Sequence, residues 1–190
     1  AGGVYLQGGD NSVPLNATFE GSTISGNKAQ STLEVYGGAM EVKGTNAVFN
    51  DVVITNNSAV ATGENSFAIG GAIASSRRGS GTSYSPTHLT FNVTKDAAFT
   101  GNTVSTAGDA NKMYNTGDSI VSTSGGFLFM ETGSDAAFNV GEGATLTIGE
   151  EGAVTGDTDT IASGIPTTAE ANRDANIYDP FITKTGAGTL

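Results

Sequence analysis

Two stretches of the chain share one alternation of apolar and polar residues. Residues 17–29 read ATFEGSTISGNKA and residues 47–59 read AVFNDVVITNNSA, and five of the 13 positions are identical. Around Phe19 and its counterpart the alternation has the period of two that is typical of β-strands. Each stretch also contains a pair, Gly26-Asn27 or Asn56-Asn57, that tolerates positive φ. The pattern predicts short strands joined by sharp corners.

A second repeated element is a pair of glycines followed by small or apolar residues. It begins at Gly2, Gly37, Gly70 and Gly125. Weaker copies of the first pattern are found at residues 97–105, where AAFTGNTVS repeats the spacing from Phe19 to Ser25, and after Phe138. We therefore predict about four copies of a unit that consists of a Gly-Gly strand and a Phe strand.

A single unit of this size cannot bury a core. Stacked copies let each Phe lie on the next and let each backbone N–H pair with the neighbouring copy. The sequence therefore predicts an all-β protein, a right-handed parallel β-helix (β-solenoid), as one domain over residues 1–190 with roughly five to nine coils. A β-sandwich is the alternative fold, because regular short strands with turn signals fit it too.

Three polar stretches interrupt the repeats, at about residues 75–88, 106–119 and 157–176. In solenoids, insertions are usually loops on one face, and that face often binds a partner. We expect the first two insertions to present the contact groups of the protein.

Composition supports strands and excludes several functions. The chain has 13 Val and 10 Ile against 7 Leu, and branching at Cβ favours a pleated surface. Its formal net charge is −11 with eight Lys and Arg, so it offers no basic face for a nucleic acid. The absence of Cys excludes disulfides, thiolate metal sites and cysteine nucleophiles. The longest apolar run, Phe127–Met130, has four residues, whereas a transmembrane helix needs about 20. No secretory signal opens the chain, as expected of a mature or excised fragment.

Three segments resemble a known family. Gly37-Gly38-Ala39-Met40, Gly70-Gly71-Ala72-Ile73 and Phe99-Thr100-Gly101-Asn102 are similar to the GGA(I/L/V) and FxxN repeats of chlamydial polymorphic membrane proteins. Those proteins are autotransporters (type V secretion) whose β-helical passenger domains are surface adhesins. The final segment, residues 176–190, also resembles passenger sequences, through Tyr-Asp-Pro and Lys-Thr-Gly-Ala-Gly-Thr-Leu. Ser22 and Val52 stand where FxxN would place Asn after Phe19 and Phe49, and the chain lacks the Cys that is usual in the chlamydial family.

Candidate catalytic groups are few. His88 is the only His, and we predict that it lies in a surface loop without a nucleophile motif beside it. Carboxylate pairs leave open a β-helical carbohydrate-active enzyme, a polysaccharide lyase or glycosidase, which needs two carboxylates that face a cleft. These pairs are Glu150-Glu151, Asp157/Asp159 and Glu142/Glu150. Oxygen ligands occur at residues 8–12 and 157–159, but no calcium-binding motif is present, so we predict no metal and no cofactor.

The candidate binding residues lie in the first insertion. Arg77 and Arg78 are the one pair of adjacent basic residues in an acidic chain, and Tyr84 and His88 follow them. An amphipathic aromatic ring such as that of Tyr84 is favoured at recognition surfaces.

We predict a non-catalytic adhesin or structural segment of an autotransporter passenger. It would be displayed at the bacterial cell surface (outer membrane) or secreted, and would bind a host cell-surface protein or glycan or associate with itself. Any membrane contact would be made only by a barrel domain outside this fragment.

Overall fold

The computed structural model describes residues 1–9, 13–64, 66–80, 83–107, 125–149, 158–164 and 180–190. Every regular element in these residues is a β-strand, so the predicted all-β class is confirmed. Strands pair in parallel throughout, except that β12 (Arg78–Ser80) and β13 (Ser83–Ser85) form the one antiparallel strand pair of the described residues. A β-sandwich needs antiparallel sheets, and that alternative is therefore wrong.

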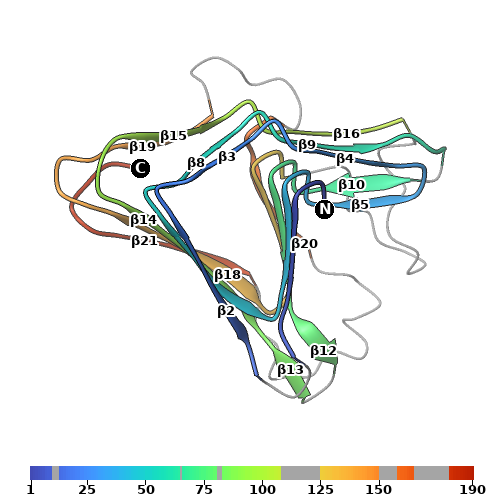
Figure 1. Ribbon diagram of the computed structural model, residues 1–190, viewed down its shortest axis with the longest axis horizontal. Helices are drawn as coiled ribbons and strands as arrows, with labels where there is room; N and C mark the ends of the chain where they lie inside the picture. The colour runs from blue at the N-terminus through green and yellow to red at the C-terminus, as the bar shows by residue number, and fades with distance from the viewer. Residues whose placement is uncertain (10–12, 65, 81–82, 108–124, 150–157, 165–179) are drawn as a thin grey trace.

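Five parallel sheets, named A to E here, contain the other strands (Figure 1). Sheet A contains β1 (Val4–Gln7), β6 (Met40–Lys43), β11 (Ile73–Ser76), β17 (Leu128–Glu131) and β20 (Ile161–Gly164). Sheet B contains β2 (Leu15–Glu20), β7 (Thr45–Asn50), β14 (Thr87–Val93), β18 (Ser134–Val140) and β21 (Phe181–Thr185). Sheet C contains β3 (Thr23–Ser25), β8 (Val53–Thr55), β15 (Ala97–Thr100) and β19 (Leu146–Ile148). Sheet D contains β4 (Lys28–Ser31), β9 (Ser58–Ala61) and β16 (Thr103–Thr106), and sheet E contains β5 (Glu34–Tyr36) and β10 (Phe67–Ile69).

The chain visits the sheets in a fixed order. Strands β1 to β5 enter sheets A to E in turn, and β6 to β10 repeat that order directly above them. We call one such passage of the chain a rung. Sheets A, B and C enclose a triangle in Figure 1, and sheets D and E extend from one of its corners. Equivalent residues of successive rungs are therefore neighbours although they are about 30 to 55 residues apart in sequence.

Phenylalanine rings fill the triangle. Phe19, Phe49, Phe91 and Phe138 stack almost parallel, with centroids 5.1, 4.8 and 4.9 Å apart in that order. Offset stacking at this separation is a favourable arrangement of aromatic rings. The predicted stacking of Phe on Phe between copies is confirmed.

The predicted alignment of residues 97–105 with residues 17–25 is wrong. Phe99 lies in sheet C, where its register partner is Ile54, whose own partner is Ile24. The residue that stacks in the place of Phe19 is Phe91. The error has a physical reason, because strands of sheets B and C both place an apolar residue inward shortly before a tight corner.

The Asn residues of the corner between sheets C and D form a buried ladder. Asn27 donates its side-chain amide to Asn57 over 2.9 Å, Asn57 donates to Asn102 over 2.9 Å, and Asn102 donates to Asp159 over 2.9 Å. The residues before the three Asn have positive φ, with Gly26 at 69°, Asn56 at 57° and Gly101 at 71°. The predicted corners are confirmed. Each ladder Asn stands three residues after an inward apolar residue of sheet C, so the FxxN spacing is kept as Ile/Phe-x-x-Asn.

Replacing Asn57 with Ala tests the ladder. The side chain accepts from the backbone N–H and the amide of Asn27 and donates to the Ile24 carbonyl, so its loss leaves several buried polar groups without partners. We expect the free energy of unfolding to fall by about 2–3 kcal/mol in urea denaturation. Asn16→Ala, at an exposed position, is the control, and equal losses in the two variants would contradict the structural role of the ladder.

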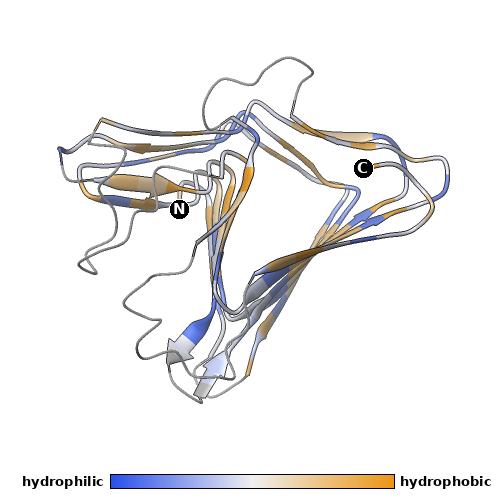
Figure 2. Ribbon diagram, turned by 180° about the vertical axis from the view of Figure 1, so that it is seen from behind, coloured by the Kyte–Doolittle hydropathy of each residue, from blue (hydrophilic) through white to orange (hydrophobic). Residues whose placement is uncertain are grey.

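Sheet E covers part of the outer face of sheet A. Phe67 and Ile69 pack against Ala74 and Phe129, and Tyr36 joins this apolar cluster. Figure 2 shows hydrophobic positions on these strands as well as along the strands that enclose the triangle. Ala74 and Phe129 on the outer face of sheet A are therefore buried, whereas Tyr5 of β1 is exposed, and the ionisable residues of this face lie half-buried between them.

Candidate functional site

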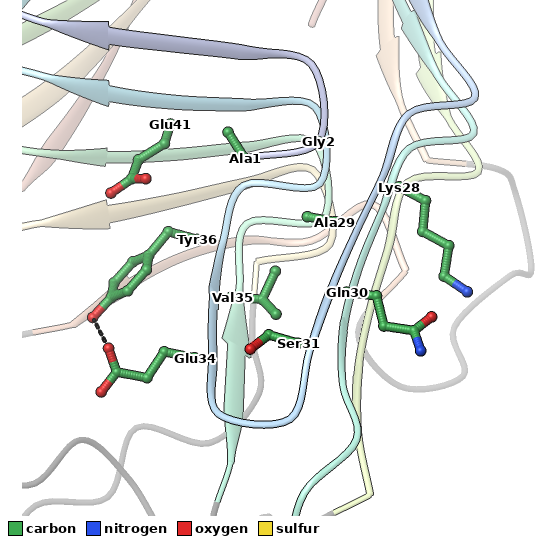
Figure 3. Close-up of a pocket in the computed structure, with 10 residues that line it drawn as sticks. All are labelled: Ala1, Gly2, Lys28, Ala29, Gln30, Ser31, Glu34, Val35, Tyr36 and Glu41. Carbon is green, nitrogen blue, oxygen red and sulfur yellow. Dashed lines mark hydrogen bonds between the residues drawn. The ribbon is translucent and has the colours of Figure 1, made fainter.

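A cavity of about 450 Å³ lies between β4 of sheet D and β5 of sheet E, where Ala1, Gly2 and Glu41 of β6 complete its lining. Figure 3 shows Lys28, Glu34, Tyr36 and Glu41 on its walls, together with small residues. The Tyr36 hydroxyl donates to Glu34 over 3.4 Å. No residue of the predicted binding set lines this cavity, and its walls carry both signs of charge.

The predicted binding residues lie at another place, the corner between sheets A and B. Here β12 and β13 form a hairpin that projects from the stack between β11 and β14 (Figure 1). The base of the hairpin packs on Gly44, where a Cβ would lie 2.6 Å from Arg78 Cβ. The Ser85 hydroxyl also donates to the Gly9 carbonyl over 3.2 Å. The hairpin is thus held by two neighbouring stretches of the stack.

The ends of the insertion predicted at residues 75–88 belong to the sheets. Ser75 and Ser76 are the last residues of β11, and Thr87 and His88 open β14. Of the described residues, the projecting part consequently consists of β12 (Arg78–Ser80) and β13 (Ser83–Ser85).

Arg77 lies against the stack. Its Nη1 donates to Thr132 Oγ1 over 2.9 Å, and its side chain packs on Gly133, where a Cβ would meet Arg77 Cβ at 3.0 Å. Its Nε is buried and has no hydrogen-bond partner within the described residues. Only part of this guanidinium is accessible to a binding partner.

Arg78 and Tyr84 belong to the hairpin itself. Arg78 pairs with Ser85, and Gly79 pairs with Tyr84, in the antiparallel register. The side chains of Arg78 and Tyr84 are half-buried. The structure therefore brings the two predicted contact residues onto one projecting element.

His88 is not in a loop, contrary to the prediction. It lies on the outer face of β14, and its Nδ1 is 2.7 Å from Asp135 Oδ2 of β18. The prediction failed because the loop ends at Pro86, where the inward-outward alternation of sheet B starts. Asp135 was missed, although its place relative to Phe138 matches that of His88 relative to Phe91.

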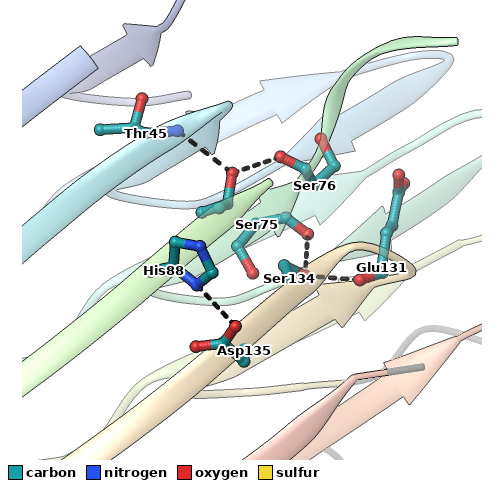
Figure 4. Close-up of polar contacts among 8 residues, drawn as sticks. Thr45, Ser75, Ser76, His88, Glu131, Ser134 and Asp135 are labelled. Carbon is teal, nitrogen blue, oxygen red and sulfur yellow. Dashed lines mark hydrogen bonds and ion pairs between the residues drawn. The ribbon is translucent and has the colours of Figure 1, made fainter. Parts of the chain in front are cut away.

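Hydroxyl groups close the corner beneath the hairpin (Figure 4). Thr87 Oγ1 donates to the Ser76 carbonyl over 2.5 Å and accepts from the Thr45 backbone N–H over 3.4 Å. Ser134 Oγ is 2.5 Å from the Glu131 carbonyl. These bonds satisfy backbone groups where the chain turns from sheet A into sheet B, so this corner is rigidly built.

Three ionisable side chains meet on the outer face of sheet A below sheet E. Lys43 Nζ is 2.6 Å from Glu41 Oε1. Burial by itself lowers the pKa of Lys43, but the hydrogen bond and the charge of Glu41 outweigh it and leave this pKa raised. Burial raises the pKa of Glu131 against the attraction of Lys43 and Arg77. The space between Tyr36, Glu41 and Glu131 is too tight for a water molecule, so these carboxyls do not form an open cleft.

Glu131→Gln is expected to stabilise the protein at neutral pH. The pKa of Glu131 is raised in the folded state above its value in the unfolded chain, which is near 4.5. The contribution of Glu131 to the free energy of unfolding is therefore greatest below pH 4.5, and it falls as the pH rises toward the folded pKa. The loss has a slope of at most about 1.4 kcal/mol per pH unit. Urea denaturation between pH 4 and pH 8 should show the variant and the wild type converging at low pH. Glu142→Gln, an exposed control, should keep the wild-type profile; a destabilised Glu131→Gln at pH 7 would contradict the assignment.

Several predicted sites lie wholly or partly outside the described residues. Glu150, Glu151 and Asp157 of the carboxylate pairs are outside them, as are Asp10 to Ser12, residues 108–119 of the second insertion, and residues 165–176 of the third. Asp159 is described, is 6% exposed and accepts from the backbone N–H groups of Gly101 and Asn102 over 2.6 and 2.7 Å. Its carboxylate belongs to the Asn ladder and does not face a cleft.

Comparisons of the chain with protein-family models, with curated proteins and with solved structures give no match in any of the three. In the part of the chain that the structure describes, no three His, Cys, Asp or Glu side chains gather closely enough to hold a metal ion. The same part has no helix with the length and apolar character to cross a bilayer.

Proposed function

We propose that the stack is a right-handed parallel β-helix, and that the chain is a non-catalytic, adhesive segment of a bacterial autotransporter passenger. The fixed order of parallel sheets supports the first part, since crossovers between parallel strands are almost always right-handed. The resemblance of the Gly-Gly-Ala and FxxN segments supports the second part. The segment would act at the cell surface or after secretion.

The observation that carries the adhesive role is the β12–β13 hairpin. Among the described residues it is the one element that lies outside the parallel sheets, and it carries Tyr84, with Arg78 at its base, on a chain whose formal net charge is −11. Directly paired residues of a hairpin share a face, so Arg78, opposite Ser85, and Tyr84, opposite Gly79, lie on opposite faces of the projection. A cationic group on one face and an aromatic ring on the other can contact an anionic or mixed surface while the acidic stack stays solvated.

Removal of the hairpin tip tests the role. Replacing residues 79–84 with a short Gly-Ser turn leaves β11, β14 and the Thr87 bonds in place. We expect binding of the purified protein to host cells to fall at least tenfold, with an unchanged β-rich circular dichroism spectrum. Arg78→Glu should cause a similar loss, and Lys95→Glu, which reverses a charge at another corner, is the matched control.

The outcomes separate the possibilities. Unchanged cell binding by a folded tip variant would show that the hairpin does not contact the host cell. Cleavage of a polysaccharide by the wild-type protein would contradict the non-catalytic role and favour a carbohydrate-active enzyme.

A further inference from the structure

The outer face of sheet B carries three rows of side chains that run along the stack, and because the side chains of the middle row are short we call this face the trough. In each strand three side chains point outward, and the middle one is the shortest or among the shortest. The middle row consists of Thr18, Val48, Thr90, Ala137 and Thr183. One flanking row consists of Asn16, Asn46, His88, Asp135 and Phe181, and the other consists of Glu20, Asn50, Asn92, Asn139 and Thr185. No described element lies over this face (Figures 1 and 2).

One wall of the trough is a continuous chain of hydrogen bonds. Asn139 donates its amide to Asn92 over 2.7 Å, Asn92 donates to Asn50 over 2.7 Å, and Asn50 donates to Glu20 over 2.5 Å. Thr185 adds its hydroxyl to Asn139. Each amide uses one of its two N–H groups and one carbonyl lone pair in these bonds. At the second, third and fourth rungs the wall therefore repeats an oriented donor and acceptor that are still able to bind a ligand.

The other wall carries a paired charge and an aromatic ring. Asp135 Oδ2 lies 2.7 Å from His88 Nδ1. Phe181, the register partner of Asp135, is 51% exposed. An exposed ring offers a polarisable apolar face that polar groups can border. The outward residues of the described strands of sheet B include no Lys and no Arg, so the trough does not attract polyanions.

The dimensions limit the ligand. The two walls are four residues apart on each strand, which is about 13 Å between Cα atoms, and neighbouring rungs are about 4.8 Å apart. After the wall side chains are placed, an α-helix of 10–12 Å diameter does not fit. A peptide strand would need backbone partners, and the face of a sheet has none because its N–H and C=O groups are bonded to adjacent strands.

We propose that this trough binds a neutral linear polysaccharide that lies along the stack axis. Sugar hydroxyls both donate and accept, as do the amides of Asn50, Asn92 and Asn139. The apolar face of a sugar ring would pack on Phe181 and over Ala137. The inference rests on the proposed adhesive function, to which it adds a ligand class, and it places that ligand on a surface other than the hairpin.

Affinity electrophoresis of the purified chain in gels with hydroxyethyl cellulose, galactomannan, polygalacturonate or chitosan tests the proposal. We expect retardation by at least one of the two neutral polymers and weaker retardation by polygalacturonate. Chitosan, which the acidic chain attracts over its whole surface, should retard the wild type and its variants alike. Ala137→Arg fills the trough floor and should weaken binding at least tenfold. Val53→Arg places the same side chain at an exposed position of sheet C and should bind as the wild type does.

Two further variants make the result decisive. Thr90→Lys blocks the same floor from the neighbouring rung, and it replaces Ala137→Arg if circular dichroism shows that variant unfolded. The hairpin-tip variant should keep wild-type retardation, so that loss of cell binding and loss of polysaccharide binding are separable. The proposal is overturned if neither neutral polymer binds, if polygalacturonate binds more tightly than they do, or if a folded floor variant binds the neutral polymer as well as Val53→Arg does.

Discussion

Phe91→Ala is expected to lower the free energy of unfolding by about 3–5 kcal/mol. The Phe91 ring is fully buried and stacks between Phe49 and Phe138, with centroids 4.8 and 4.9 Å away. Phe99 and Phe127 contact it from the side, at 5.6 and 5.8 Å. Truncation would leave a cavity that rigid backbone rungs on both sides cannot close.

Phe19→Ala is the matched control. Phe19 has the same position in its strand, but it is only partly buried and stacks on one described ring, Phe49. Its loss should cost clearly less in urea or thermal denaturation. Equal losses at the two positions would show that the rings do not act as a stack.

Gly71→Ala is the second change with a large expected effect. A Cβ at Gly71 would lie 2.2 Å from the Gly126 carbonyl oxygen and 2.4 Å from the Thr103 carbonyl oxygen. Both obstacles are backbone atoms of other rungs or sheets, so neither can move without breaking pairing. Overpacking of this kind should cost about 3 kcal/mol or more, at the upper end of such changes. Thermal denaturation is the measurement, and we expect the variant to lose its cooperative transition.

Gly26→Asn is the control for the glycine variant. A Cβ at Gly26 would meet no atom within 4 Å, and Asn56 already adopts the same left-handed backbone at the equivalent corner of the next rung. The variant should unfold as the wild type does. A Gly71→Ala protein as stable as Gly26→Asn would contradict the close approach of the rungs.

The repeats in the sequence were sufficient to predict strands, corners and stacking, but not their register. Gly2, Gly38, Gly71 and Gly126 stack, so the first Gly-Gly pair is displaced by one residue from the others. A short apolar-polar alternation is compatible with more than one register, because only the contact with the next rung distinguishes one register from another.

Sheets D and E could not be predicted for a related reason. Their shared core consists mainly of Ala, such as Ala29, Ala59 and Ala68, and small residues give almost no periodic apolar signal. The place of Asp159 in the ladder was also hidden, because it follows Asn102 by 57 residues and differs in type. Of the predicted binding residues, Arg77, Arg78 and Tyr84 lie in the segment between β11 and β14 that sequence reasoning treated as an insertion, whereas the partner of His88 lies 47 residues away on another strand.

The direction of the backbone hydrogen bonds has a mechanical consequence. Because parallel strands pair only with the rungs above and below, a pull along the stack is borne at once by all bonds of one interface between rungs. Between the third and fourth rungs, strands of sheets A, B and C share this load, and β14 pairs with β18 over seven residues. Between the fourth and fifth rungs, the strand pairs of the described residues belong to sheets A and B only. Under tension, rupture should therefore begin at β20 and β21 and travel rung by rung toward the hairpin.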